Sequence, residues 1–402
     1  MTRARATSSA ALTALLVAIG LFNSLLSDLY IPALRALGAD LGATPVQAQQ
    51  TVSLFFLACA FMSLWHGAIA DAWGRKPTVL AALAVLCLSS LACMAATRIE
   101  HLWVLRTLQG LAAGSGVVLS RAIVLDIHQG LAAQRMLGRI TLVQTAAPVL
   151  MPILGGWITL AYGWRALFAC IAAVALVMGT AVWRWLPETL PPARRRPLHP
   201  VTLWRAYREV LGSHSFLRLA VAHVGNWVSL MLYVVAAPAF VIELLGRDES
   251  GFYLVYAPMM LGMVAGFLLF PRIARRNAPR GPLAIAYAIL ALAVVLNLAL
   301  SVTLPPGLHN VVPLFLQAVG VALAMPALIG MALDPYGERA GVASSCHSFL
   351  QFAATAAVAG LLAPLLWGSM ATLALGSACL TAVGAAALAR ERACRTAAAP
   401  RG

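Results

Sequence analysis

Apolar residues dominate this chain in runs about 20 residues long, separated by short segments that contain charged residues, proline or glycine. A run of this length is what a helix needs to cross the hydrocarbon core of a bilayer. The pattern predicts membrane spans at 11–33, 48–70, 79–97, 102–125, 138–161 and 166–186, and then at 216–240, 251–271, 282–303, 310–333, 341–364 and 370–389.

The connector between the sixth and seventh predicted spans is rich in proline and arginine and is the one plausible domain boundary. We therefore expect an N-terminal six-helix bundle over 1–186, a cytoplasmic linker over 187–215, and a C-terminal six-helix bundle with a cytoplasmic tail over 216–402. The predicted fold class is an all-α integral membrane protein with twelve transmembrane helices in two six-helix bundles.

Composition agrees with this pattern: 61% of the 402 residues are hydrophobic and 10% are charged, and the mean hydropathy is +0.87. Soluble domains carry ~25% charged residues, and disordered chains are poor in apolar side chains, so both classes are excluded. The net charge of +15 raises the possibility of nucleic acid binding. However, 22 of the 28 lysine and arginine residues fall on one side of the predicted spans. This bias predicts a cytoplasmic N-terminus, a cytoplasmic C-terminus and contact with anionic lipid, with no nucleic acid partner.

The loop between the second and third predicted spans contains a spaced set of glycine and charged residues: Gly67, Asp71, Gly74, Arg75 and Lys76. This spacing resembles the G-x-x-x-D-x-x-G-R-[KR] signature of the major facilitator superfamily, and it lies in the loop where that family carries it. The resemblance implies the twelve-helix fold of that family.

Three further stretches resemble the Bcr/CflA-type drug:proton antiporters of that superfamily. Asp28, Tyr30 and Pro32 lie at the end of the first predicted span, and Arg106 with Gln109, then Arg121 and Asp126, lie in the fourth. The fifth span contains the similar series Pro148, Pro152, Gly155 and Gly156. The resemblance implies a multi-pass antiporter of the bacterial inner membrane that exports drugs in exchange for protons and confers antibiotic resistance. We expect a monomer that needs no cofactor.

Asp28 is the ionisable group of the first predicted span. A carboxylate inside a membrane is costly unless it is protonated, paired or facing water, so Asp28 is a candidate proton carrier. The alternative is a helix-end carboxylate that faces periplasmic water. Arg106 keeps its charge in a protein and needs a partner. The resemblance implies that Arg106 takes part in proton coupling, together with Gln109 and Tyr30, and the alternative is an Arg106 that snorkels to the outer interface.

The charged residues Asp71, Arg75 and Asp126 are expected to meet at the cytoplasmic face. The resemblance implies that they form a latch that holds the two bundles closed on that side, with Gly67 and Gly74 permitting a tight turn and close helix approach. The alternative is a solvated loop. In the fifth span, proline and paired glycines are expected to bend the helix and admit a neighbour, unless they serve packing alone.

Other polar groups in the spans are candidates to line a cavity or to bond a neighbouring helix. They include Asn23, Asn226 and Gln351. Tyr233 is a candidate to line an apolar site, and the alternative is an interface anchor. Arg121 is a candidate to line the cavity, and the alternative is a side chain that snorkels to the inner interface. His66 is expected at the interface. His223 is expected to be a hydrogen-bonded packing residue, and the alternative is a histidine that titrates in a cavity. No pair of histidines has the spacing of a metal site, and no nucleotide-binding or hydrolase motif is present.

The sequence therefore predicts proton-coupled export of small, mostly hydrophobic compounds. The alternative within transport is an exporter or importer of an endogenous metabolite. A membrane sensor without transport activity and an intramembrane enzyme are the remote alternatives.

Overall fold

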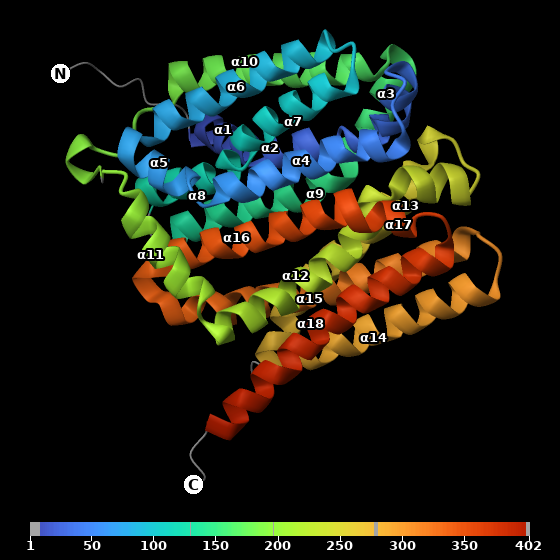
Figure 1. Cartoon of the computed structure of the whole chain (residues 1–402). Helices are drawn as coiled ribbons and strands as arrows, with labels where there is room; N and C mark the ends of the chain where they lie inside the picture. The colour runs from blue at the N-terminus through green and yellow to red at the C-terminus, as the bar shows by residue number, and fades with distance from the viewer. Residues whose placement is uncertain (1–8, 129, 196, 277–279, 399–402) are drawn as a thin grey trace. The chain divides into compact units, whose positions relative to one another are not determined.

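The computed structural model describes residues 9–128, 130–195, 197–276 and 280–398. Within these ranges it describes the backbone alone for 9–11, 23, 24, 117, 130, 131, 134, 138, 139, 141–149, 249, 250, 275, 276, 280, 338, 397 and 398. Over the described residues every regular element is a helix (Figure 1).

The chain divides into two compact units, Met1–His199 and Pro200–Gly402. The helices of the first unit are α1 (Ser9–Gly20), α2 (Phe22–Ser27), η1 (Ile31–Ala33), α3 (Leu34–Asp40), α4 (Pro45–Ser63), α5 (His66–Trp73), α6 (Arg75–Met94), α7 (Ile99–Ala113), α8 (Ser115–Ile127), α9 (Gly130–Tyr162), α10 (Trp164–Trp185) and η2 (Pro192–Arg194). Helix α4 packs along α7, α6 packs along α10, and α1 contacts both α8 and α9.

The second unit has its own set of packed helices, in which α12 contacts α15, α16 and α18, and α15 also contacts α13 and α14. They are α11 (Pro200–Leu211), α12 (His214–Val235), η3 (Ala239–Leu244), η4 (Glu249–Phe252), α13 (Tyr253–Arg276), α14 (Arg280–Thr303), η5 (Leu308–Val311), α15 (Val312–Leu333), η6 (Asp334–Arg339), α16 (Ala340–Ala357), η7 (Val358–Leu362), α17 (Ala363–Leu366) and α18 (Met370–Ala398).

Many of these helices are long and apolar enough to cross a membrane. Among the described residues, nine pass this test alone, and eleven pass if each of two bent pairs forms one span. One pair joins Leu12–Gly20 to Leu25–Asp40 with a bend of 49°, and the other joins Pro45–Ser63 to His66–Trp73 with a bend of 52°. The predicted fifth span falls on α9, where only the shorter apolar stretch Leu150–Tyr162 is counted. The all-helical architecture is therefore confirmed, and the number twelve stays a prediction.

Many large apolar side chains of the spans lie on the outer surface, in addition to those of the core. Leu88, Val104, Val177 and Val295 are each more than 60% exposed, whereas Arg106 is fully buried. A water-soluble protein seldom presents so many large apolar side chains to solvent, but hydrocarbon is a favourable environment for them. The outer faces of both units are thus suited to contact lipid.

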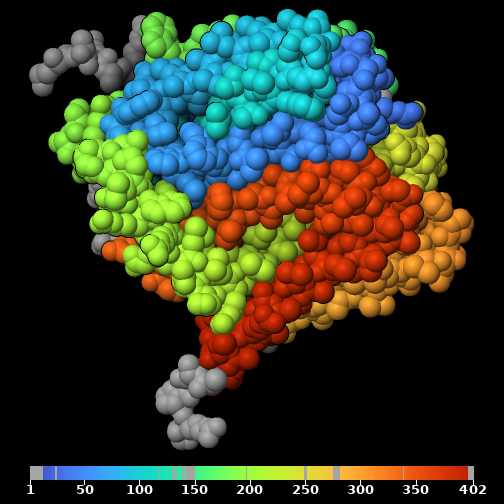
Figure 2. Space-filling view, viewed as in Figure 1, coloured from blue at the N-terminus to red at the C-terminus, as the bar shows by residue number. Residues whose placement is uncertain are grey.

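The connector between the units contains a helix that the sequence reading did not anticipate. Helix α11 is amphipathic: it buries Tyr207 and Val210 and exposes Trp204 and Arg205. Figure 2 shows this yellow-green segment at the surface of the molecule. The connector is therefore partly ordered against the second unit, where α11 contacts α12 and α16.

Candidate functional site

The candidate site of the first unit is built around Arg106 on α7. Its side chain is fully buried, and its guanidinium carbon lies 4.1 Å from the centre of the Tyr30 ring and 4.3 Å from that of Phe55. A cation over an aromatic face is attracted by the negative π surface, most strongly where water is excluded. The alternative in which Arg106 snorkels to the outer interface is therefore wrong, because the side chain points into the helix bundle.

Hydrogen bonds fix the groups around this cation. Arg106 Nη1 donates to Gln109 Oε1 at 2.7 Å, one helical turn further along α7, and Gln109 Nε2 donates to Ser90 Oγ on α6 at 2.9 Å. The Nε and Nη2 atoms of Arg106 have no hydrogen-bond partner among the described residues. The guanidinium therefore has donor capacity left for another acceptor.

Tyr30 is held in place by α4. Thr51 Oγ1 donates to the Ala48 carbonyl oxygen at 2.6 Å, so the Tyr30 hydroxyl is the donor in its 2.7 Å bond to Thr51. The aromatic ring is thereby oriented over Arg106. Phe55 and Thr51 are members of the site that the sequence reading missed. They carry no motif, and only the packing of α4 against α7 brings them there.

Asp28 directly follows α2, two residues before Tyr30, and is half-buried. Its Oδ1 accepts a hydrogen bond of 3.0 Å from Ser27 Oγ. Helix α9 approaches this segment closely, since a Cβ atom on the buried Gly155 would collide with the carbonyl oxygen of Leu29. The glycine predicted to admit a neighbouring helix thus does so beside Asp28.

A second constellation joins α5, α6 and α8. Arg75 is 11% exposed, and its Nη1 lies 2.6 Å from Asp71 Oδ1 while its Nε lies 3.1 Å from Asp126 Oδ2. The structure therefore brings together the three residues that were expected to meet. Gly74 between α5 and α6 has a φ of 109°, a conformation that favours glycine. Lys76 Nζ donates to the Trp183 carbonyl oxygen at 2.8 Å.

Glu188 is a member of this cluster that the sequence reading missed. Its Oε1 accepts from the backbone N–H of Arg75, at the start of α6, and from that of Leu190, each at 3.0 Å. A carboxylate is favourable at a helix N-terminus because the N–H groups there have no partner within the helix. Thr189 next to it donates to Asp126 Oδ2 at 3.1 Å. The sequence offered one signal for Glu188: it is an acidic residue directly after the predicted sixth span, on the same predicted side of the membrane as the basic loop of Arg75 and Lys76.

Three expectations in the spans and loops are corrected by the structure. His66 is not interfacial: it is 3% exposed, and its Nε2 lies 2.9 Å from the Leu111 carbonyl oxygen. Gly67 does not permit a close helix approach, since a Cβ atom there would meet no described atom within 4 Å. His223 is not hydrogen-bonded, because neither ring nitrogen has a partner among the described residues.

The second unit contains a buried polar network. Asn297 Nδ2 donates to Tyr233 Oη at 2.6 Å, and Asn226 Nδ2 donates to Tyr287 Oη at 3.0 Å. Gln317 Nε2 lies 2.8 Å from both Ser229 Oγ and Ser377 Oγ. Asn226 is therefore bonded between helices, which was one of the two readings for amide side chains in spans. Tyr233 is buried and bonded to Asn297, so it is not an interface anchor.

The remaining predicted residues are dispersed. Pro152 and Gly156 are buried in α9, Gln351 is half-buried and Arg121 is exposed. The side chains of Asn23 and Pro148 lie outside the described residues.

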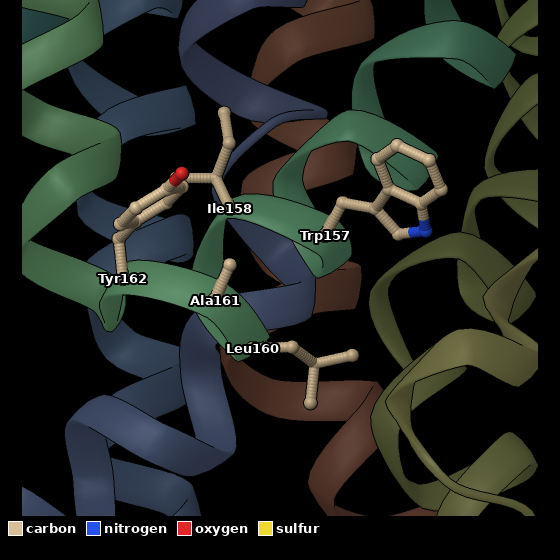
Figure 3. Close-up of a pocket in the computed structure, with 5 residues that line it drawn as sticks. All are labelled: Trp157, Ile158, Leu160, Ala161 and Tyr162. Carbon is tan, nitrogen blue, oxygen red and sulfur yellow. The ribbon is translucent and has the colours of Figure 1, made fainter.

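Two further features of the described residues concern metal binding and a surface hollow. In the described part of the chain, no three His, Cys, Asp or Glu side chains are grouped so that they could hold a metal ion. An open apolar hollow of about 500 Å³ lies on α9, lined by Trp157, Ile158, Leu160, Ala161 and Tyr162. Figure 3 shows Trp157 and Leu160 extending to one side of the helix and Tyr162 to the other. This hollow includes none of the site residues expected from the motifs.

Comparison with known proteins agrees with this architecture and with the motifs. Residues 16–359 match the Major Facilitator Superfamily, so the chain belongs to this family of transporters. It is 30% identical to the multidrug resistance protein MdtL of Salmonella heidelberg, over 81% of this chain and 80% of the relative. It is 28% identical to the bicyclomycin resistance protein homolog of Haemophilus influenzae, over 84% of this chain and 85% of the relative. The resemblance expected from the motifs is confirmed.

Solved structures show the same fold at lower sequence identity. The peptide transporter POT in complex with sulfate has a TM-score of 0.75 at 13% identity and covers 94% of each chain. The human organic anion transporter MFSD10 has a TM-score of 0.67 at 19% identity, over 96% of this chain and 99% of the other. These structures show the fold, and membership of the family shows that the protein is a multi-pass membrane transporter of small molecules.

Proposed function

We propose that this protein is a proton-coupled antiporter that exports small, mostly hydrophobic drugs or toxic compounds across the bacterial inner membrane. In this proposal twelve spans form two six-helix bundles with both termini in the cytoplasm, and transport proceeds by alternating access. The relatives named for multidrug and bicyclomycin resistance support the class of substrate.

The observation that carries the proposal is the buried Arg106 between two aromatic rings, with two guanidinium nitrogens that lack a partner among the described residues. A fixed cation in an apolar site favours a negative charge nearby and disfavours a further positive one. Asp28, on the same segment as Tyr30, is the carboxylate that we assign to the transported proton. Its ionised form favours a bound substrate, and its protonated form favours release.

In the proposed cycle, a periplasmic proton binds Asp28 when the cavity is open outward, and the substrate leaves. The inward-open state releases the proton and takes up a new substrate. One proton that crosses ~100 mV and one pH unit supplies about 3.7 kcal/mol, enough to support a concentration ratio of about 500 for a neutral substrate. Stoichiometric exchange with a single proton is thus sufficient for export.

The cluster around Arg75 supports the alternating-access part of the proposal. Arg75 links Asp71 on α5 with Asp126 on α8, and Glu188 closes the N-terminus of α6. Such charge-assisted bonds hold helix ends together and are released as a unit when the ends separate. We assign to this cluster the role of a latch on the cytoplasmic side, in the state that is closed inward.

The test is drug transport in proteoliposomes under an imposed pH gradient. Wild type, Asp28→Asn and the control Glu100→Gln are compared, with the neutral drug chloramphenicol and the lipophilic cation ethidium as substrates. The control changes a carboxylate of an exposed surface ion pair with Arg98. We expect gradient-driven transport in wild type and control and its loss in Asp28→Asn. Transport that ignores both the gradient and the Asp28 substitution would overturn proton antiport.

A further inference from the structure

Two buried histidines face each other inside the second unit. His223 on α12 is 1% exposed and His347 on α16 is 5% exposed. Their ring centres are 4.8 Å apart, with 39° between the ring planes. The two imidazoles are therefore in direct contact, although 124 positions separate them in the sequence.

The polar atoms of this pair lack ordinary partners. Both nitrogens of His223 and Nε2 of His347 have no hydrogen-bond partner among the described residues. Buried polar atoms are almost always hydrogen-bonded, because an unpaired one loses its water without compensation. Packing alone does not explain two such side chains at one contact, because apolar residues would fill the same space without the free-energy cost of burying unpaired polar atoms.

No described charged group of the elements that surround the pair competes for it. Glu391 on α18 is engaged by Arg218, Arg395 and Ser215, and Glu209 on α11 is paired with Arg339. Helix α15 and η7 carry no titratable side chain, and the Tyr256 hydroxyl of α13 donates to the Val234 carbonyl oxygen. The other described charged or histidine side chains on α12 and the elements that contact it or α16 are exposed: Arg205, Arg208, His214, Arg272, Asp334, Arg390 and Arg392.

The titratable groups of these elements also include a thiol and a phenol. Cys346 precedes His347 on α16 and interacts electrostatically with Tyr207 of α11. Burial raises the pKa of Tyr207 to about 12, so this phenol stays neutral at physiological pH. Neither group supplies a negative charge to the histidines, and each imidazole has the other as its available partner.

We propose that His223 and His347 together form a proton-binding site in the second unit, which takes up a single proton and shares it between the two imidazoles. A neutral imidazole has one N–H donor and one acceptor nitrogen, whereas an imidazolium has two donors. The proton comes from water and binds the acceptor nitrogen of one ring. That ring then donates to the acceptor nitrogen of the other, and loss of the proton to water restores the neutral pair.

The site lies near the start of both helices. His223 is in the third turn of α12 and His347 in the second or third turn of α16. Under the proposed topology these are the cytoplasmic ends of spans seven and eleven, so the pair samples the proton activity on the side where the drug is bound. This location of the site in the transport cycle rests on the proposed function, whereas proton binding by the pair does not.

The direct test uses full-length protein labelled with ¹⁵N-histidine, in lipid, with EDTA present to remove metal ions. Ring nitrogen chemical shifts are followed from pH 5 to pH 8 in wild type and in His223→Gln, His347→Gln and the control His101→Gln, whose histidine is exposed. In wild type and in the control, we expect the ring nitrogen signals of His223 and His347 to follow one shared titration. Replacement of either member of the pair should abolish the titration of the other. The proposal would be overturned if His223 and His347 titrated independently in wild type, or if neither of them titrated. This wild-type result does not depend on how well the variants fold.

A second readout separates this site from the proposed antiport. In the proteoliposome assay, His223→Gln is expected to shift the pH profile of transport by roughly one unit while the dependence on Asp28 remains. If the histidine pair titrates but transport does not depend on the pH gradient, the antiport proposal is wrong and the proton-binding site stands. If the histidine pair does not titrate but the protein exchanges drug for protons, the proposed proton-binding site is wrong and antiport stands.

Discussion

The Tyr30 ring covers the Arg106 guanidinium at 4.1 Å, while the Tyr30 hydroxyl donates a 2.7 Å hydrogen bond to Thr51 on another helix. The two ends of this side chain therefore have separate partners. The ring contacts the buried Arg106 guanidinium, and the hydroxyl fixes the position of the ring. Their contributions can be measured separately by substitution.

We expect Tyr30→Leu to impair transport far more than Tyr30→Phe. Leucine removes the cation–π contact, worth ~2 kcal/mol in a desolvated site, or about a 30-fold effect if it is expressed in transport. Phenylalanine keeps the ring and costs about 1 kcal/mol for the lost hydrogen bond. Initial transport rates under a fixed pH gradient, with the melting temperature of each variant, make the comparison. Equal losses in both variants would show that the hydroxyl, and not the ring, serves Arg106.

A second prediction concerns the contact between α9 and the segment that holds Asp28. Gly155→Ala places a methyl group against the Leu29 carbonyl oxygen, so α9 must move away. Overpacking of this kind typically costs ~1–3 kcal/mol. We expect a lower melting temperature and a reduced transport rate.

The matched control for Gly155 is Gly179→Ala on α10. A Cβ atom at Gly179 meets no described atom within 4 Å. Because alanine is the better helix former, this variant should melt at the same temperature or slightly higher. A Gly155→Ala protein as stable and active as the control would show that α9 does not need to approach Leu29.

The sequence was sufficient to predict the helical architecture because hydrophobic runs report directly on membrane spans. It also predicted that Asp71, Arg75 and Asp126 would meet, since loop position and motif spacing place them at adjacent helix ends. It did not predict Phe55 or Thr51 as neighbours of Arg106. Those contacts depend on the rotation of α4 about its own axis, which the sequence does not encode because the apolar residues of α4 do not gather on one face.

The same limit explains the error at His66 and the alternative that stayed open at Arg106. Position along a span gives the depth of a residue in the bilayer, and depth alone suggested the interface for His66 and permitted snorkelling for Arg106. Whether a side chain faces lipid or the bundle depends on helix packing, and both side chains proved to be buried. Polar residues in membrane helices generally face inward, so that rule was the better guide at these two positions.

The third prediction tests the carboxylate at the start of α6. Glu188→Gln keeps the shape of the side chain but removes the negative charge of the carboxylate, whose oxygen accepts hydrogen bonds from the Arg75 and Leu190 N–H groups. Anions at a helix N-terminus contribute ~0.3–1 kcal/mol, and up to ~2 kcal/mol where partly buried. We expect a lower melting temperature and faster interconversion of inward-open and outward-open states, measured by the distance between spin labels on the two bundles.

The control for Glu188 is Glu100→Gln, which removes the same charge from an exposed pair with Arg98. Exposed pairs contribute little, so this variant should match wild type in both measurements. If the two variants behave alike, Glu188 does not contribute to the latch.

The last prediction concerns Tyr233 and Asn297, whose 2.6 Å hydrogen bond joins α12 to α14 inside the second unit. Tyr233→Phe leaves the buried Asn297 amide without this acceptor and should cost ~1–3 kcal/mol, and Asn297→Leu leaves the Tyr233 hydroxyl unpaired at a similar cost. The double variant removes both polar groups, so we expect it to be closer to wild type than the sum of the single losses. Unfolding free energies measured in detergent complete this double-mutant cycle. Losses that simply add would mean that the two side chains are stabilised by other partners and that their hydrogen bond does not hold the helices together.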